Sequence, residues 1–139
     1  RINRVENQRM PIKIQWFDEY KHIILWTIEG QWTLAELHEA YSNGNAMCAE
    51  VPENTINVIV DITRSNSMPS NIFSALSTRV NSEMPNYDMA VAVTNNGLIK
   101  AFVNIITSLP TLREKFVVVK TMDDALAFIK KRRLARQSR

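Results

Sequence analysis

Apolar and polar residues alternate from Ile12 to Trp16, which is the pattern of a strand with one buried face. Residues 22–29 are rich in β-branched and aromatic side chains and predict a second strand. A turn is predicted over residues 18–21, and only residues 17–21 separate the two segments. Because parallel neighbours need a long crossover, this short connection predicts an antiparallel hairpin.

The hairpin is followed by the clearest helix signal in the chain. Thr33 and Glu36 form a capping box, in which each side chain satisfies a free backbone N–H of the first turn. One stripe at alternating three- and four-residue spacings predicts the face turned to a core: Leu34, Leu37, Tyr41, Gly44, Cys48 and Val51. Gly44 on this stripe should either admit a closely approaching backbone or weaken the helix.

Three strand–helix steps complete the chain. Residues 56–62, 89–93 and 116–119 are nearly continuous apolar runs, which is typical of strands covered on both faces. We expect a polar loop over 63–70 and helices over 71–84, over 96–109 and after the cap at Thr121, the last continuing into the basic end.

The predicted order is ββαβαβαβα, an α/β sandwich with a mostly parallel sheet and an antiparallel opening hairpin. We expect a flexible leader over residues 1–10, one domain over 11–134 and a basic tail over 135–139.

The charge is unevenly distributed along the chain. The net charge is +3, with +2 over residues 1–10, +6 over 130–139 and −5 over the remaining 119 residues. Nucleic acid binds to basic protein surfaces, so the net negative charge of residues 11–129 does not favour nucleic-acid binding. Nothing approaches a run of about 20 apolar residues, so we expect no transmembrane segment. The lone Cys48 suits a reducing compartment, and we expect a cytoplasmic protein.

The sequence offers no catalytic grouping. Its three glycines, Gly30, Gly44 and Gly97, do not form a phosphate-binding loop. The two histidines and Cys48 lack the spacing of metal ligands, and no serine lies in a nucleophile elbow. Adjacent acids at Asp123 and Asp124 fit the first turn of a helix, where they stabilise the dipole. We therefore expect no cofactor, no metal and no enzymatic activity.

Two surfaces are candidate binding sites. In open α/β sheets, ligands bind at the carboxyl ends of the strands. That edge is predicted to carry Thr33, Arg64, Asn66, Asn71, Asn95, Asn96 and Gly97. The helix predicted over 96–109 is apolar around most of its circumference, so it either lines a ligand cavity, joins a partner or second copy, or is buried in the chain's own core. The face in question comprises Ile99, Phe102, Val103 and Ile106. For the strand ends, the alternative is ordinary turn and cap residues.

Three segments carry a resemblance to a known family: the strand over 23–30 running into the cap at 33–37, the strand end at 58–61, and residues 122–129. In this order they resemble the STAS domain family and its SpoIIAA-like branch of bacterial proteins, which are also similar to lipid-binding CRAL-TRIO (Sec14-like) domains. The resemblance implies a bacterial regulatory module that binds a protein partner.

The family carries a phosphorylated serine at the start of its second helix, in an Asp-Ser setting with glycine. After Asp61 this chain has neither that pair nor a glycine. Ser67 falls closest to the switch position by count, whereas Ser70 is the better helix cap. Both are candidates for a phospho-switch, and the alternative is that they only cap and decorate a polar loop.

The leading hypothesis is a non-enzymatic regulatory or protein-interaction module of the STAS type. The alternative is a carrier of a hydrophobic small molecule or lipid. The basic end from Lys130 to Arg139 either lies in water beside the negative end of a helix dipole or makes a weak contact with an anionic membrane.

Overall fold

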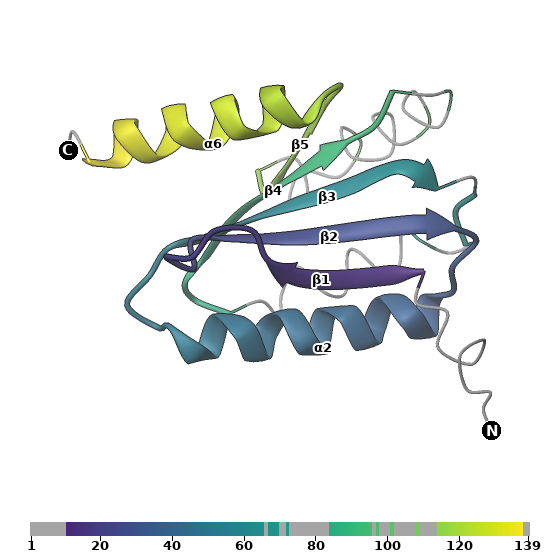
Figure 1. Cartoon of the computed structure of the whole chain (residues 1–139), viewed down its shortest axis with the longest axis horizontal. Coiled ribbons are helices and arrows are strands. Elements are labelled where there is room, and N and C mark those ends of the chain that lie inside the picture. Colours follow the sequence, from purple (N-terminus) through teal and green to yellow (C-terminus); the bar gives the residue numbers. More distant parts are fainter. Residues whose placement is uncertain are drawn as a thin grey trace.

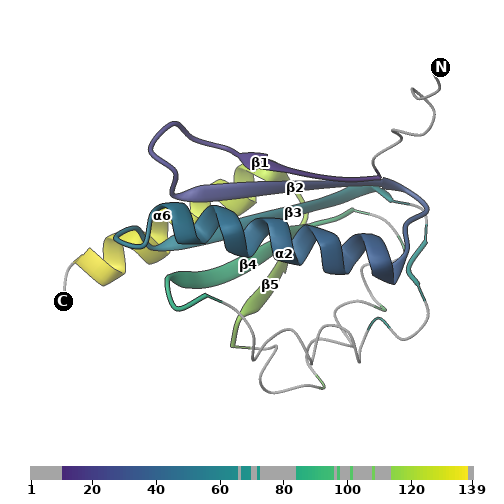
Figure 2. The same ribbon diagram turned by 90° about the horizontal axis from the view of Figure 1, so that it is seen from below.

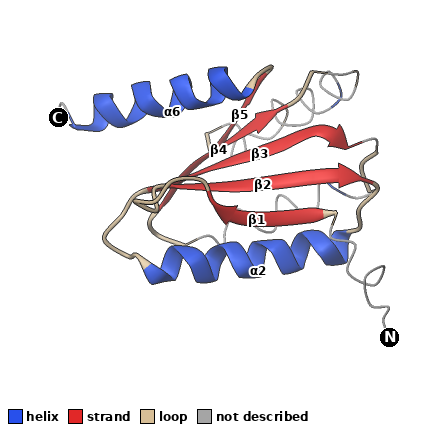
Figure 3. Cartoon of the chain, in the orientation of Figure 1, coloured by secondary structure: helices blue, strands red, loops and turns tan. Residues whose placement is uncertain are grey.

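A computed structural model describes residues 11–65, 67–69, 72, 84–95, 97, 101, 108 and 114–137. The described residues form one sheet and two helices (Figure 3). In chain order the elements are β1 (Ile12–Trp16), β2 (Ile23–Gly30), α2 (Leu34–Glu50), β3 (Ile56–Ser65), β4 (Tyr87–Val93), β5 (Phe116–Val119) and α6 (Met122–Gln137).

The five strands lie in sequence order, β1-β2-β3-β4-β5. β1 is antiparallel to β2, and every other neighbouring pair is parallel, which confirms the mostly parallel sheet with an opening hairpin. The hairpin turn is closed by Asp18, whose carboxylate accepts hydrogen bonds from the backbone N–H groups of His22 and Ile23, both at 2.9 Å.

The two described helices cover opposite faces of the sheet (Figures 1 and 2). Side chains alternate along each strand, so β3 sends Val58 and Ile62 toward α2 and Ile59 toward α6. Ala125 and Ile129 of α6 complete the second cluster. The near-continuous apolar pattern of β3 and β4 therefore reflects burial on both faces, as predicted.

β3 is longer than the sequence pattern indicates. The expected strand ends at residue 62 and the expected loop begins at residue 63, but the strand continues to Ser65. Its last residues pair with β2, with Arg64 opposite Glu29 and Ser65 opposite Gly30. Backbone pairing with a neighbouring strand thus outweighs the polar side chains of this segment, and the expectation of a loop over 63–65 is wrong.

The helices predicted over 71–84 and 96–109 fall mostly outside the described residues. Ile72 and Ala101 are helical, whereas Met84 and Ser108 are not. α6 begins at Met122, where the Thr121 hydroxyl accepts from the backbone N–H of Asp124 at 3.0 Å.

α6 is fixed to β4 by a partly buried ion-pair group. Asp88, whose side chain is 7% exposed, accepts from Arg132 Nε at 2.7 Å and from Arg132 Nη2 at 3.0 Å. Arg136 Nη1 lies 3.3 Å from the same carboxylate. The hydrogen bond and the charge of Asp88 raise the pKa of the Arg132 guanidinium above its ordinary value, against the opposing effect of burial. Two of the basic residues near the carboxyl end are therefore structural.

Candidate functional site

The carboxyl ends of β2, β3 and β4 meet at one edge of the sheet, where α2 begins (Figure 1). Because parallel strands end together, segments far apart in the chain are brought to this edge. We call the described residues at or just after these strand ends the strand-end surface: Thr33, Arg64, Ser67, Asn95 and Gly97.

Thr33 is committed to the helix cap. Its hydroxyl oxygen accepts from the backbone N–H of Glu36 at 3.1 Å, and the Glu36 carboxylate accepts from the backbone N–H of Thr33 at 2.9 Å. This is the reciprocal capping box that the sequence predicts. The side chain remains exposed, so a partner could contact it without opening the cap.

Arg64 projects from β3 beside β2. Its Nη1 lies 3.1 Å from the Glu29 carboxylate, and its side chain is 76% exposed. A pair this exposed contributes little to stability because water screens both charges. The Arg64 guanidinium can therefore leave Glu29 and pair with an acidic group of a partner with little loss of free energy.

Two successive hydrogen bonds, which were not predicted from the sequence, hold the backbone beneath this surface. The Trp32 indole N–H donates to Ser65 Oγ at 3.0 Å, and Ser65 Oγ lies 3.0 Å from the backbone carbonyl of Ser67. Trp32 and Ser65 are both buried. The contacts join the β2–α2 connection, the end of β3 and the segment after it, so the backbone of the candidate switch serine is held in place.

The end of β4 contributes Asn95 and Gly97, both exposed. Thr94, just before them, is fully buried, and its backbone N–H donates to the carbonyl of Val119 at 3.1 Å. This bond ties the loop to β5, so the two exposed residues extend from a fixed point at the strand-end edge.

Several predicted site residues lie outside the described part of the chain. From the strand-end edge these are Asn66, Ser70, Asn71 and Asn96. From the predicted apolar helix they are Ile99, Phe102, Val103 and Ile106.

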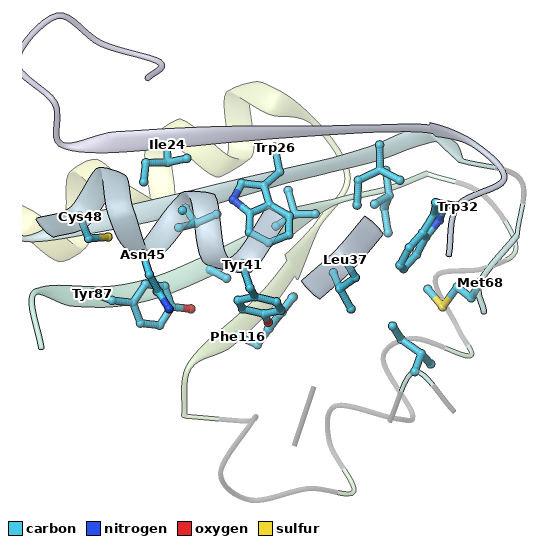
Figure 4. Close-up of a pocket in the computed structure, with 17 residues that line it drawn as sticks. Ile24, Trp26, Trp32, Leu37, Tyr41, Asn45, Cys48, Met68, Tyr87 and Phe116 are labelled. Carbon is cyan, nitrogen blue, oxygen red and sulfur yellow. The ribbon is translucent and has the colours of Figure 1, made fainter. Parts of the chain in front are cut away.

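An apolar pocket lies between α2 and the sheet (Figure 4). Its volume is about 80 Å³. The described residues that line it come from α2, from the connection between β2 and α2, from the α2-facing sides of β2, β3, β4 and β5, and from the segment after β3: Ile24, Trp26, Ile28, Trp32, Leu37, Tyr41, Gly44, Asn45, Cys48, Val58, Val60, Ile62, Met68, Ile72, Tyr87, Ala90 and Phe116.

Trp26 is the central side chain of this pocket. Its ring meets Tyr41 edge-on, with centroids 5.2 Å apart and planes at 76°. Its indole N–H is buried and has no hydrogen-bond partner among the described residues. At Gly44 an added Cβ would lie 3.8 Å from the Trp26 ring, so the group approaching this glycine is an indole and the predicted backbone approach is not seen in the described residues.

The sequence signal for this pocket is the same α2 stripe that predicts a face turned to the core. The α2 stripe of Leu37, Tyr41, Gly44 and Cys48 was predicted to face inward, and these four residues line the pocket. A small residue between two larger ones on such a stripe leaves space beside a facing side chain. The facing side chain, Trp26, could not be paired with Gly44 from sequence spacing alone.

Within the described ranges, no group of three or more histidine, cysteine or acidic side chains is placed to hold a metal ion. In the same part of the chain, no helix is both long and apolar enough to cross a membrane.

Comparison with known proteins identifies the fold. No protein-family model matches the sequence, and no curated protein matches it significantly. A crystal structure of an uncharacterised DUF3478-family protein from Shewanella loihica PV-4, described as having a SpoIIAA-like fold, superposes with a TM-score of 0.59. The match covers 84% of this chain and 90% of that one at 14% identity. The chain therefore has a SpoIIAA-like fold, which confirms the STAS-type expectation for its architecture.

Proposed function

We propose that this SpoIIAA-like domain is a non-enzymatic regulatory module of the bacterial cytoplasm that binds a protein partner through its strand-end surface. The observation that carries the proposal is the Trp32–Ser65–Ser67 chain of hydrogen bonds, which fixes three separate segments below that surface. A preorganised surface loses less conformational entropy when a partner binds.

The chemistry of the surface favours a polar, partly acidic partner. Arg64 supplies a guanidinium on a side chain that is 76% exposed, and Thr33 and Asn95 add exposed hydrogen-bonding groups. Ser67 is half-buried with its backbone held by Ser65, so phosphorylation there would add about −1.5 to −2 charges to the surface. Such a charge would repel an acidic partner, which makes Ser67 a candidate off-switch.

The test compares proteins captured from a bacterial lysate by the wild-type chain, by Arg64→Glu and by Ser67→Asp. Lys131→Glu is the matched control, because it reverses an exposed charge in the carboxyl half of α6, away from the strand ends. We expect a partner that binds wild type and Lys131→Glu equally and binds both strand-end variants at least tenfold more weakly. Calorimetry with the purified partner measures the difference. Undiminished binding to both variants would overturn the proposal.

A second candidate function is binding of a small hydrophobic ligand in the apolar pocket. The Trp26 indole N–H, which has no partner among the residues that the structure describes, lies in an apolar lining and favours a ligand with one hydrogen-bond acceptor. The volume of about 80 Å³ is roughly half that of an engineered cavity that binds benzene. The pocket would therefore hold a very small molecule or one end of a longer one.

Native mass spectrometry of freshly purified protein tests this second candidate. A co-purifying hydrophobic molecule, together with a lower melting temperature once that molecule is removed, would support it. A ligand-free spectrum combined with no thermal shift from small aromatic compounds would exclude it.

A further inference from the structure

Large apolar side chains are exposed at one end of the molecule. Among the described residues, Phe17 is 41% exposed, Tyr20 71% and Leu134 54%. Phe17 and Tyr20 belong to the β1–β2 turn and Leu134 to the carboxyl half of α6, and Figure 1 shows both segments at the end opposite the strand-end surface.

A groove of about 310 Å³ joins these two segments. The turn contributes Asp18 and His22 to it, and α6 contributes Leu126 and the successive face Lys130, Arg133, Leu134 and Gln137. The i, i+3, i+4 spacing places Lys130, Arg133 and Leu134 on one side of the helix. The groove lining therefore presents Leu134 together with two cations, and the exposed Phe17 and Tyr20 lie on the turn that forms its other side. We call Phe17, Tyr20, Lys130, Arg133 and Leu134 the aromatic–basic end.

The cations of this end are available for an outside partner. Lys130 and Arg133 make no ion pair with any described residue, whereas Arg132 and Arg136 are held by Asp88. The acids of the turn are Asp18, whose Oδ1 accepts two backbone N–H groups, and the exposed Glu19. Of the two, Asp18 lines the groove, so the groove carries the two cations Lys130 and Arg133 against one carboxylate and is net positive.

We propose that the aromatic–basic end docks reversibly on an anionic lipid bilayer. Three separate apolar side chains are too few for a stable protein–protein interface, which buries about 800 Å² on each partner. They are sufficient for insertion at the interfacial level of a bilayer, where a tyrosine keeps its hydroxyl in water. Each cation near an anionic surface adds about 1 kcal/mol. Weak apolar insertion and weak electrostatics together give reversible binding.

This inference is independent of the proposed partner-binding function. The two surfaces lie at opposite ends of the strands, so a protein bound to lipid would turn its strand-end surface away from the membrane (Figures 1 and 2). Failure of either proposal leaves the other unaffected.

Co-sedimentation with vesicles tests the proposal. The probes are vesicles of phosphatidylcholine alone and of phosphatidylcholine with about 40% phosphatidylglycerol, a fraction chosen to give a strongly negative surface. We expect binding to the anionic vesicles only, lost in high salt because the charges are screened. Lys130→Glu/Arg133→Glu should reduce the partition coefficient at least tenfold, and Phe17→Ser/Tyr20→Ser severalfold.

The matched control is Lys13→Glu/Lys120→Glu, which reverses the same number of exposed charges away from this end. It should bind vesicles within about a factor of three of wild type, a margin that allows for the long-range loss of net charge. Circular dichroism and denaturant unfolding show that each variant is folded. Equal binding to both vesicle types, or an equal loss in the control, would overturn the proposal. So would binding to a polyglutamate peptide without binding to vesicles, because it would identify an acidic protein as the partner.

Discussion

The hydrogen bond from Trp32 to Ser65 joins two side chains that lie 33 positions apart in the chain. The indole N–H is buried, so it would lose its water partners on folding whether or not Ser65 were present. The serine hydroxyl offsets that loss and also reaches the backbone of Ser67. The pair thus links burial in the core to the position of a surface segment.

A double-mutant cycle on this pair measures the coupling. Ser65→Ala leaves the indole N–H unsatisfied and should lower the free energy of unfolding by about 1–3 kcal/mol. Trp32→Phe removes the donor along with part of the ring. The double variant should be less destabilised than the sum of the two, with an interaction energy of about 1 kcal/mol in urea unfolding. Strict additivity would show that the hydrogen bond contributes nothing.

Asp88 provides a second residue-level prediction. Asp88→Asn leaves two guanidinium groups facing a neutral side chain and should lower the free energy of unfolding by about 1–3 kcal/mol, a range reduced because both arginines are partly exposed. Glu53→Gln, at an exposed position without an ion pair among the described residues, should change it by less than about 0.5 kcal/mol. An Asp88→Asn protein as stable as this control would show that the ion pairs of Asp88 with Arg132 and Arg136 do not stabilise the fold.

The raised pKa of Arg132 determines how the stabilisation by the Asp88–Arg132 ion pair depends on pH. A group whose pKa is higher in the folded state stabilises the protein fully below its unfolded pKa and loses that contribution as pH rises through its folded pKa. Because the ordinary arginine pKa is already far above neutrality, the Arg132 contribution should be constant over about pH 6–9. Urea midpoints for wild type and Asp88→Asn measured across that range give the contribution at each pH.

At the level of elements, α2 shows which helix boundaries a sequence pattern can predict and which it cannot. Its start was predictable because the capping box is a local interaction between Thr33 and Glu36. Its carboxyl end is held from a distance: the Asn86 side-chain amide donates to the carbonyls of Cys48 and Val51 at 3.0 and 3.1 Å. No local spacing reports a contact across 38 residues. The same reason explains why the last residues of β3 were expected to be a loop.

Cys48 allows the contribution of Asn86 to be measured. The thiol is buried in the last turn of α2, so a thiol reagent reaches it only when this end of the helix opens. Asn86→Ala removes both hydrogen bonds to the helix end and should raise the labelling rate under native conditions about tenfold, equivalent to about 1.4 kcal/mol. Ser42→Ala, at an exposed position of the same helix, should leave the rate unchanged. Equal rates in all three proteins would show that Asn86 does not hold the helix.

Gly44 provides a test of the pocket within the same helix. A methyl group here would meet the Trp26 ring at 3.8 Å, an ordinary contact distance, and alanine is the better helix former. Gly44→Ala should therefore raise the free energy of unfolding by about 0.5–1 kcal/mol in urea titrations. The same methyl narrows the pocket, so binding of a small hydrophobic ligand should weaken while stability rises. A destabilised variant would show that the space beside Gly44 is needed in the folded protein.

At the scale of the whole molecule, the order of the described elements was predictable, and the proposed binding surfaces were predictable only in part. Hydrophobic periodicity reports which face of a segment is buried, and it gave the hairpin, the parallel strands and both described helices. From that order, the rule that parallel strands end together predicts Thr33, Arg64 and Asn95 at one edge of the sheet. The basic half of the aromatic–basic end is part of the segment from Lys130 to Arg139, for which the sequence offers an anionic membrane as one alternative. Its aromatic half was missed, because the surface joins a turn at residues 17–22 to a helix more than 100 positions later, and its apolar members are isolated in sequence.

The orientation of the whole domain on a membrane follows from the separation of its two ends. A polarity-sensitive dye attached at Tyr20→Cys would sit in the turn proposed to enter the bilayer interface, whereas the same dye at Asn95→Cys would sit at the strand-end surface. With Cys48→Ala removing the native thiol, each protein carries one label. Anionic vesicles should shift the emission of the first dye to shorter wavelength and leave the second unchanged, because only the first exchanges water for lipid. Since Tyr20→Cys removes one apolar anchor, vesicles are added until binding saturates. Shifts of equal size at the two positions would contradict a single docking face, and a shift only at position 95 would place the lipid contact at the strand ends.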